Sequence, residues 1–460
     1  MSDSNWQGKK IVVLGAARQG LALAGYLAMH NARVMLNDMK TPDQISGNLQ
    51  ALRQMGVEMV FGSHPLELLD NTQMLCLSGG IPLSLPIVQK AMQSGIILSN
   101  DSQIFMEAVP CKTIGITGSA GKTTTTTLVG RMAEADQKCM VWVGGNIGLP
   151  LISLVDQMKS DDLVVMELSS FQLEQMTISP NIAAVLNITP NHLDRHKTMQ
   201  AYIEAKSHIL THQKPGDVAV LNRDDEGSWS LKEKIIGQQY SFGFDKPAYP
   251  YYGTSYHNDW VYLSSGTHEE KLMPRNLILL KGEHNLANIL AACAIAAAAG
   301  FSAESMISGV AGFNGVPHRL ELVRVLHGVA WYNDSIATAP ERTMAAIHSF
   351  QEPLVLMLGG RDKKLPWESL IALINERVDH VVLFGEAGSM IESKLKEVHG
   401  KERPYTISLH EKMEDAVVAA HQVAQTGDVV LLSPGCTSFD AFRDFEERGE
   451  KFRQWVNSLS

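Results

Sequence analysis

Short apolar runs alternate with longer amphipathic stretches along most of this chain, which is the pattern of an α/β protein. Near the start, apolar runs at residues 10–14, 33–36, 74–77 and 96–98 predict strands, and the stretch that ends at His30 predicts a helix. Strands that alternate with helices favour a small open sheet covered by helices. We therefore expect residues 1–100 to form one α/β domain.

The same alternation restarts after residue 100. Apolar runs at residues 113–117, 163–166 and 183–186 predict buried strands, and helices are expected over 124–135 and about 285–299. Residues 240–263 are aromatic, β-like and rich in turns, which indicates an insertion or an edge region. We expect residues 101–315 to form a second domain.

A third set of strands, at residues 329–332, 354–358, 380–384 and 429–432, is separated by helical stretches. It predicts a third, doubly wound domain over residues 316–460. The fold class expected for the 460-residue chain is therefore α/β with three domains: an N-terminal Rossmann-like unit, a central P-loop ATPase-like domain and a C-terminal Rossmann-like domain.

Composition narrows the class of partner. The formal charge is −10 and the basic residues are dispersed, which argues against nucleic acid or an anionic membrane as the main partner. Five cysteines without metal-type spacing indicate reduced thiols in the cytoplasm. The Ala-rich run 286–299 is too short for a membrane span, and residues 1–10 lack the apolar core of a signal peptide.

The strongest chemical signal is the sequence GSAGKTT, which lies between a predicted strand and a predicted helix. Its residues are Gly118, Ser119, Ala120, Gly121, Lys122, Thr123 and Thr124. Glycines let backbone N–H groups wrap a phosphate, and the helix N-terminus adds a partial positive charge. We expect Lys122 to reach the β- and γ-phosphates of a nucleotide and Thr123 to contact Mg²⁺.

Two further candidates lie at the ends of neighbouring strands. Glu167 ends the run at 163–166, where a triphosphate site commonly places a second magnesium ligand. His192 and Asp194 follow the strand at 183–186 and lie at the same predicted edge. A solvated carboxylate and a structural histidine are the alternative interpretations of these residues.

The N-terminal turn is a weaker nucleotide signal. Gly15 and Gly20 match the outer glycines of a dinucleotide fingerprint, but Ala17 replaces the middle glycine that lets the backbone approach a pyrophosphate. This argues against ordinary NAD binding. Asp38, at the end of the second strand, remains a candidate acceptor for a ribose or uracil group.

Taken in order, several motifs resemble those of the Mur ligases. They are the phosphate loop, ELSSFQLE at 167–174, NHLDR at 191–195, YIEAK at 202–206, GEHNLAN at 282–288, PHR at 317–319, NDS at 333–335 and LSPG at 432–435. They span essentially the whole chain, and their joint order is far more specific than any one of them.

The resemblance implies an ATP-dependent amide-bond-forming ligase of peptidoglycan precursor synthesis that adds D-glutamate to UDP-N-acetylmuramoyl-L-alanine. The γ-phosphate of ATP would activate the alanyl carboxylate as an acyl phosphate, which the glutamate amine would then attack. The resemblance also implies two Mg²⁺ ions and a carbamylated Lys206, although a solvated helical lysine is the alternative from the residues alone. We expect a monomer whose partners are small molecules.

The resemblance assigns the site residues to four groups. The catalytic group is Lys122, Glu167, His192 and Lys206, and the metal ligands are Thr123, Glu167, His192 and Lys206. Beyond the phosphate loop, ATP would contact Asn288, Arg319 and Asp334. The UDP-sugar would contact Arg18, Gln19, Asp38, Gly80 and Asn146, and glutamate would contact Thr338, Lys363, Ser438 and Phe445. The turn 433–438 is expected to open a helix whose N–H groups bind a carboxylate.

One departure from the family pattern matters. The usual run DSKATN reads DSIATA here, so Ile336 replaces a lysine near the nucleotide and the acceptor, with Arg361 and Lys364 as candidate replacements. L-glutamate therefore remains an alternative acceptor. Three further alternatives are less favoured. The complete N-terminal α/β unit argues against a folylpolyglutamate-synthetase-like ligase, and Ala17 argues against an NAD(P)-binding protein. A nucleotide-gated regulator would not need Glu167, His192 and Lys206 together.

Overall fold

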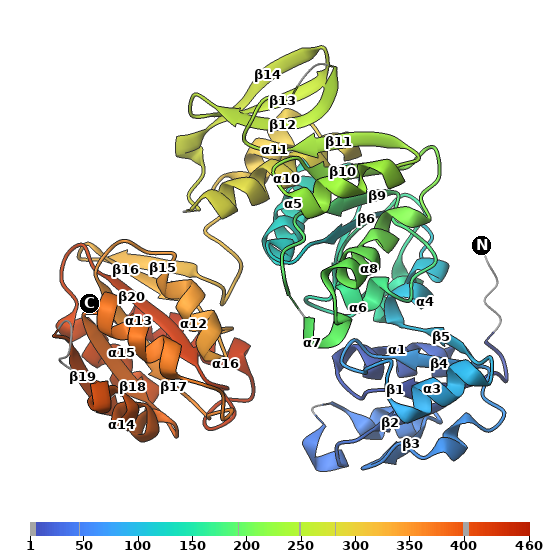
Figure 1. Ribbon diagram of the computed structural model, residues 1–460, viewed down its shortest axis with the longest axis horizontal. Helices are drawn as coiled ribbons and strands as arrows, with labels where there is room; N and C mark the ends of the chain where they lie inside the picture. Colours follow the sequence, from blue (N-terminus) through green and yellow to red (C-terminus); the bar gives the residue numbers. More distant parts are fainter. Residues whose placement is uncertain (1–5, 46, 192, 248–249, 281, 399–403) are drawn as a thin grey trace. The chain divides into compact units, whose positions relative to one another are not determined.

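The computed structural model describes residues 6–45, 47–191, 193–247, 250–280, 282–398 and 404–460. The chain forms two compact units, which are described separately. The first comprises residues 1–279 and 283–312, and the second comprises residues 280–282 and 313–460 (Figure 1). In the described part of the chain no helix is both long and apolar enough to cross a bilayer.

The N-terminal sheet of the first unit is parallel and has the order β3-β2-β1-β4-β5. Its strands are β1 (Lys10–Leu14), β2 (Arg33–Asp38), β3 (Glu58–Phe61), β4 (Met74–Leu77) and β5 (Ile97–Ser99), and the helices include α1 (Arg18–Met29), α2 (Leu49–Gln54), α3 (Pro86–Gln93) and α4 (Asp101–Ala108). Edge strand β3 is half-exposed and carries Glu58, so its apolar signal was too weak to predict.

The second sheet of this unit has nine strands in the order β14-β13-β12-β11-β10-β9-β6-β8-β7. The parallel part consists of β6 (Lys112–Thr117), β7 (Val141–Gly145), β8 (Leu163–Glu167), β9 (Ile182–Val185), β10 (Val218–Asn222), β11 (Gln238–Phe242) and β12 (Tyr251–His257). Antiparallel strands β13 (Trp260–Gly266) and β14 (His268–Pro274) follow β12 at one edge, so the aromatic stretch does form an edge region.

Helices connect and cover this sheet. They are α5 (Lys122–Asp136), α6 (Ser170–Leu173), α7 (Leu193–His196), α8 (Met199–Thr211), α9 (Glu226–Trp229), α10 (Glu283–Ala299) and α11 (Ala303–Val310). Strand β6 lies between β8 and β9, so the carboxyl ends of three buried strands meet where α5 begins. Helix α10 is buried along most of its length, which explains its Ala-rich sequence.

The two sheets of the first unit share one apolar core. We call the part of the unit built on the first sheet the N-terminal region, up to α4, and the part built on the nine-stranded sheet the central region, from β6 to α11. Leu23 of α1 and Phe105 of α4 belong to the same buried cluster as Leu151 and Val164 of the central region. Polar contacts cross at the same place: the Asn100 side-chain amide donates to the Gln172 carbonyl at 2.8 Å. The N-terminal and central regions are therefore packed against each other as one body.

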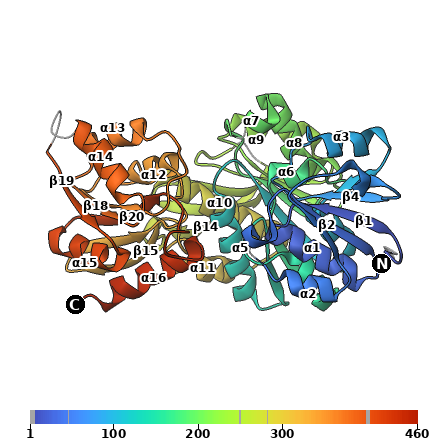
Figure 2. The same ribbon diagram turned by 90° about the horizontal axis from the view of Figure 1, so that it is seen from below.

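The second unit contains a six-stranded sheet in the order β15-β16-β20-β17-β18-β19. Its strands are β15 (Glu321–Leu326), β16 (Val329–Asn333), β17 (Leu354–Gly359), β18 (His380–Phe384), β19 (Thr406–His410) and β20 (Val429–Gly435), and its helices are α12 (Pro340–Ile347), α13 (Glu368–Arg377), α14 (Gly388–Val398), α15 (Met413–Val423) and α16 (Phe445–Ser458). Figure 2 shows α13 and α14 on one face of this sheet and α15 and α16 on the other.

The prediction that the turn 433–438 opens a helix is wrong. Strand β20 continues through Gly435, which pairs with Gly359 of β17, and α16 begins only at Phe445. The helix starts there because the Asp444 side chain caps it, accepting from the Glu447 N–H at 2.8 Å. The turn therefore offers no helix N-terminus to a carboxylate.

Candidate functional site

The phosphate loop connects β6 to α5 at the centre of the large sheet. Gly121 has a left-handed φ of 81°, and a Cβ there would lie 2.1 Å from Asn288 Oδ1. The Ala120 N–H donates to Asn187 Oδ1 at 2.8 Å, and Asn187 Nδ2 donates to the Ala120 carbonyl at 3.1 Å. The loop is therefore held from β9 on one side and lies against α10 on the other, which brings Asn288 next to the predicted phosphate site.

Lys122 begins α5 and folds back over the loop. Its Nζ donates to the Gly118 carbonyl at 2.9 Å and to the Ser119 carbonyl at 3.3 Å. Thr124, in the first turn of the helix, is buried. The Ser119 hydroxyl donates to the Thr189 carbonyl at 2.9 Å. The ammonium group and the helix N-terminus therefore concentrate positive charge at the loop, as phosphate binding requires.

Thr123 and Glu167 meet at the ends of β6 and β8. The Thr123 hydroxyl donates to Glu167 Oε2 at 2.8 Å, and Asn146 Nδ2 donates to Oε1 at 2.9 Å. Glu167 is only 2% exposed. A hydroxyl and a buried carboxylate side by side are oxygen ligands of the kind Mg²⁺ takes together with phosphate oxygens, so these residues fit one such ion.

Within the described ranges, no three His, Cys, Asp or Glu side chains gather in a way that could hold a metal ion. His192, predicted as a ligand, lies outside the described residues. Of the residues predicted to hold a second ion, the structure describes Glu167 and Lys206, and both are buried.

Lys206 lies on α8 and is almost completely buried beneath the phosphate loop. Its Nζ donates to the Gly118 carbonyl at 2.9 Å and to Thr117 Oγ1 at 3.3 Å, and lies 4.8 Å from the centre of the Tyr202 ring. Burial, and next the charge of Lys122, hold the pKa of Lys206 well below its usual value, with Glu167 in partial opposition. The buried amine is therefore biased toward its neutral, nucleophilic form.

The N-terminal turn is built by close packing of backbone. A Cβ at Gly15 would lie 2.7 Å from Ser78 Cβ, and one at Gly20 would lie 1.9 Å from the Gly15 carbonyl oxygen. Both Asp38 oxygens accept from backbone N–H groups, of Ala16 at 2.6 Å and of Lys40 at 2.8 Å. The glycines thus serve the turn itself, and Asp38 fixes its position at the end of β2.

Three other predicted UDP-sugar residues lie where the N-terminal and central regions meet, and Arg18 is exposed at the start of α1. Gln19 Nε2 donates to the Gly145 carbonyl, beside Asn146. The Gly80 carbonyl accepts from Arg195 of α7 at 3.1 Å. The structure therefore brings Gln19, Gly80 and Asn146 to one boundary between the two sheets of the first unit.

In the second unit, Asp334 directly follows β16 and is deeply buried. Its carboxyl accepts from Ser433 Oγ at 2.8 Å and from the Leu320 N–H at 3.2 Å. Burial raises the pKa of Asp334 to about 7, against the opposing hydrogen bonds and the charge of the neighbouring, exposed Arg319. Arg319 therefore lies near enough to Asp334 for its charge to act on that carboxyl.

The four residues predicted to bind glutamate also lie in this unit. Lys363 Nζ donates to Thr338 Oγ1 at 3.0 Å, and burial, followed by the charge of Arg342, lowers the pKa of Lys363. Ser438 is buried after β20, and Phe445 begins α16, where its carbonyl accepts from Ser335 Oγ at 2.8 Å. Thr338 and Lys363 are therefore in direct contact.

Sequence reasoning missed Arg448 of α16, a fully buried guanidinium group. It donates to Ser335 Oγ at 3.0 Å, to the Ser335 carbonyl at 2.8 Å and to the Cys436 carbonyl at 3.2 Å. Burial lowers its pKa to about 10. Arg361, one of the two candidate replacements for the lysine missing at Ile336, pairs with Glu386 at 2.9 Å, whereas Arg448 contacts the residue that precedes Ile336.

Comparisons with known proteins cover the whole chain. Residues 9–99 match the Mur ligase MurD-like N-terminal domain, residues 116–296 the Mur ligase middle domain, and residues 318–436 the glutamate ligase domain of Mur ligases.

Relatives extend over the same length. The UDP-N-acetylmuramoylalanine–D-glutamate ligase of Clostridium tetani is 37% identical over 452 residues, which cover 98% of this chain and 97% of that protein. The ligase of the same name from Acetivibrio thermocellus is 38% identical over 456 residues, with the same shares covered. A MurF ligase from Thermotoga maritima, solved in complex with ADP, has a TM-score of 0.54 and 18% identity, with 100% of both chains covered. This protein therefore belongs to the Mur ligase family and has its three-domain α/β fold.

Proposed function

We propose that this protein is an ATP-dependent carbon–nitrogen ligase that adds D-glutamate to UDP-N-acetylmuramoyl-L-alanine in peptidoglycan precursor synthesis, and so supports cell wall biogenesis, cell shape and division. The observation that carries the proposal is that two groups contact the phosphate loop: Glu167, which accepts from the Thr123 hydroxyl, and the buried amine of Lys206, which donates to the Gly118 carbonyl. The full-length relatives that bear the D-glutamate ligase name point to the same reaction.

The chemistry needs activation because a carboxylate is a poor electrophile. The alanyl carboxylate oxygen attacks the γ-phosphorus of ATP, ADP leaves, and an acyl phosphate forms. The amine of glutamate then attacks the acyl carbon, and the tetrahedral intermediate expels inorganic phosphate and loses a proton. Lys122 and the loop N–H groups hold the phosphates and offset their charge, which is most of what this transfer requires of a protein.

Two Mg²⁺ ions would supply further charge neutralisation at the transferred phosphoryl group. Thr123 and Glu167 would hold the first, and Glu167, His192 and a carbamylated Lys206 would hold the second. A neutral amine can attack CO₂, and the burial of Lys206 favours that form. ¹³C NMR of protein equilibrated with ¹³C-bicarbonate should show a carbamate carbon that Lys206→Met abolishes, and its absence from the wild-type protein would contradict this assignment.

The remaining substrate contacts are proposed on the same basis. ATP would contact the loop from Gly118 to Thr124, with Asn288, Arg319 and Asp334 near adenine and ribose. The UDP-sugar would contact Arg18, Gln19, Asp38, Gly80 and Asn146, and glutamate would contact Thr338, Lys363, Ser438 and Phe445. We place the domain boundaries near residues 100 and 315, and we propose a cytoplasmic monomer whose five cysteines are free thiols.

The test is ATP-dependent phosphate release with UDP-N-acetylmuramoyl-L-alanine and D-glutamate, L-glutamate or no amino acid. Release that requires both the sugar nucleotide and D-glutamate is the expected result. If only L-glutamate supports release, the alternative acceptor is correct and Ile336 becomes the first position to change to lysine. Release that ignores every amino acid would contradict the ligase assignment.

A further inference from the structure

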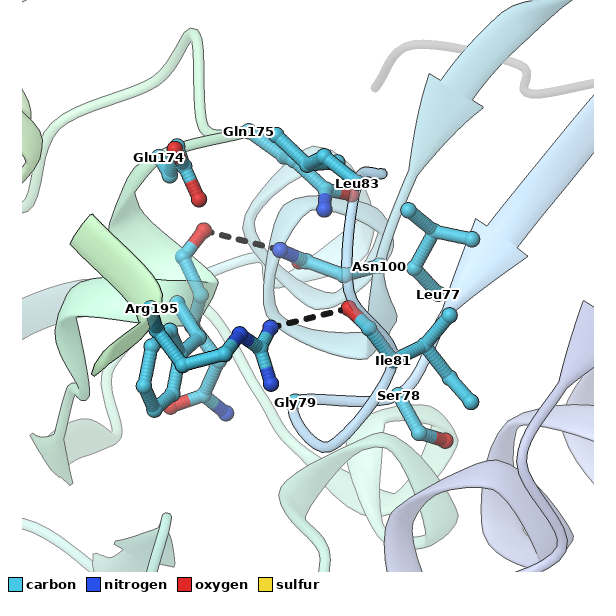
Figure 3. A pocket seen from close by; sticks show the side chains of 11 residues that line it. Leu77, Ser78, Gly79, Ile81, Leu83, Asn100, Glu174, Gln175 and Arg195 are labelled. Atoms are coloured by element: carbon cyan, nitrogen blue, oxygen red, sulfur yellow. Dashed lines mark hydrogen bonds between the residues drawn. The ribbon is translucent and has the colours of Figure 1, made fainter. Parts of the chain in front are cut away.

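Arg195 makes a contact that spans the two sheets of the first unit. From α7 in the central region, it donates to the Gly80 carbonyl at 3.1 Å and to the Ile81 carbonyl at 3.0 Å, both in the turn after β4 of the N-terminal sheet. Figure 3 shows the guanidinium reaching this turn beside a small pocket lined by residues of both regions. We propose that Arg195 is a positioning residue that holds the turn at residues 78–81, here called the sugar-nucleotide turn, in a fixed position relative to the phosphate loop.

Arg195 adds an external restraint to a turn that its own backbone closes, through the Ile81 N–H donating to the Ser78 carbonyl at 2.9 Å. Gly79 and Gly80 have open space where a Cβ would lie, so side-chain packing does not fix them. The N-terminal sheet holds the start of the turn, through the Ser78 N–H on the Leu14 carbonyl at 2.9 Å and Ser78 Oγ on the Gly15 carbonyl at 3.1 Å. The carbonyls of Gly80 and Ile81, at its far end, are the ones bound by Arg195.

Arg195 is itself held in place. Its guanidinium lies 4.5 Å from the centre of the Phe171 ring. The carboxyl of Glu174 is near enough to feel its charge, yet the two hydrogen bonds go to neutral carbonyls. A planar group with several fixed N–H donors suits two adjacent carbonyls above an aromatic ring, and lysine cannot reproduce this geometry.

The support continues from Phe171 to the phosphate loop. The Phe171 ring stacks on His196 with ring centres 5.2 Å apart and an interplanar angle of 3°, and His196 Nε2 lies 2.9 Å from Ser170 Oγ. The His196 ring centre is 5.1 Å from that of Tyr202, whose hydroxyl lies 3.1 Å from Ser119 Oγ of the loop. A continuous series of side-chain contacts therefore connects the sugar-nucleotide turn with the phosphate loop.

This inference rests on the proposed function, because the turn contains Gly80 of the proposed UDP-sugar site. Replacing Arg195 by methionine keeps an apolar side chain over Phe171 but removes both hydrogen bonds. The expected result is a rise in KM for UDP-N-acetylmuramoyl-L-alanine on the order of tenfold or more, with kcat and the KM values for ATP and glutamate within about twofold of wild type. Arg195→Lys should give an intermediate KM.

Arg131 offers a matched control. It also donates to two backbone carbonyls, of Gly309 at 2.8 Å and Ala311 at 3.1 Å, but both lie in the central region. Arg131→Met should lower thermal stability and leave the KM for the sugar nucleotide unchanged. If Arg131→Met raises that KM as much as Arg195→Met does, or if Arg195→Met lowers kcat with every KM unchanged, the positioning role is wrong.

Isothermal titration of the full-length protein with UDP-N-acetylmuramoyl-L-alanine, in the absence of ATP, separates this inference from the proposed function. If the wild-type protein binds the sugar nucleotide and Arg195→Met binds it about tenfold more weakly, the positioning role is supported. Equal binding by both proteins overturns the role of Arg195 and leaves the proposed function intact. If the wild-type protein does not bind, the proposed function fails, and the positioning role fails with it.

Discussion

Replacing Gly121 by alanine should damage the phosphate loop through two separable effects. The first is backbone strain: at a φ of 81° an alanine costs about 1–2 kcal/mol. The second is overlap with Asn288, because the new Cβ would lie 2.1 Å from Oδ1, whereas real Cβ contacts are essentially never under 3.0 Å. Asn288 must withdraw and lose its 3.3 Å hydrogen bond to Asn285, at a cost of roughly 0.5–1.5 kcal/mol. The total is about 1.5–3.5 kcal/mol.

Gly300 provides the control, because its φ of 78° is nearly the same and no atom lies within 4 Å of its Cβ position. Gly300→Ala should therefore show the backbone strain alone. We expect urea denaturation to give a larger loss of unfolding free energy for Gly121→Ala than for Gly300→Ala, and titration with a fluorescent ATP analogue to show at least tenfold weaker binding for Gly121→Ala only.

A double variant tests the steric contact directly. Adding Asn288→Ala to Gly121→Ala removes the overlapping atom, so the two changes together should destabilise the protein by about 1 kcal/mol less than their sum. Equal costs at Gly121 and Gly300, unchanged ATP binding and strict additivity with Asn288→Ala would together refute the argument.

Three further substitutions, the last with a control on the same helix, test buried ionisable groups. Because the folded-state pKa of Asp334 is raised, the stability that this carboxyl contributes is complete below about pH 4 and is lost as pH rises toward 7. Asp334→Asn should therefore become more stable relative to wild type across this range, by at most about 4 kcal/mol. A difference in Tm that does not change with pH would contradict this. Lys206→Met should abolish ligation while Tm stays equal or rises by a degree or more, since it removes a buried amine; a lower Tm would contradict the burial argument. Arg448→Met should destabilise the second unit by about 2–4 kcal/mol and speed hydrogen exchange around Ser335, because buried carbonyls lose their donors. Arg453→Met, which removes partly exposed ion pairs on the same helix, should cost about 1 kcal/mol or less.

The parts of the fold that were predictable from the sequence are those with strong local signals. Strands β1, β4 and β18 lie at the predicted residues, because each is a short, largely buried apolar run. The phosphate loop was recognisable because its glycines, lysine and threonines do their work within one contiguous segment. Edge strands such as β3 and β19 carry alternating or exposed residues, so local pattern does not separate them from loops.

The parts that were not predictable depend on partners distant in the chain. In the sequence, Arg448 looks like any charged residue on an amphipathic helix. The structure shows that it is fully buried and donates to the carbonyl of Ser335, more than a hundred residues upstream, and to that of Cys436. Arg195 lies within a recognised motif, yet its two acceptors come from the other sheet. Lys206 differs because resemblance marked the residue, while the cause of its perturbed pKa, burial beneath the loop, needed the structure. A local sequence pattern was thus enough to predict the phosphate loop. Arg195 and Arg448 could be identified only from the structure, because their role depends on backbone carbonyls that lie elsewhere in the chain and need hydrogen-bond donors.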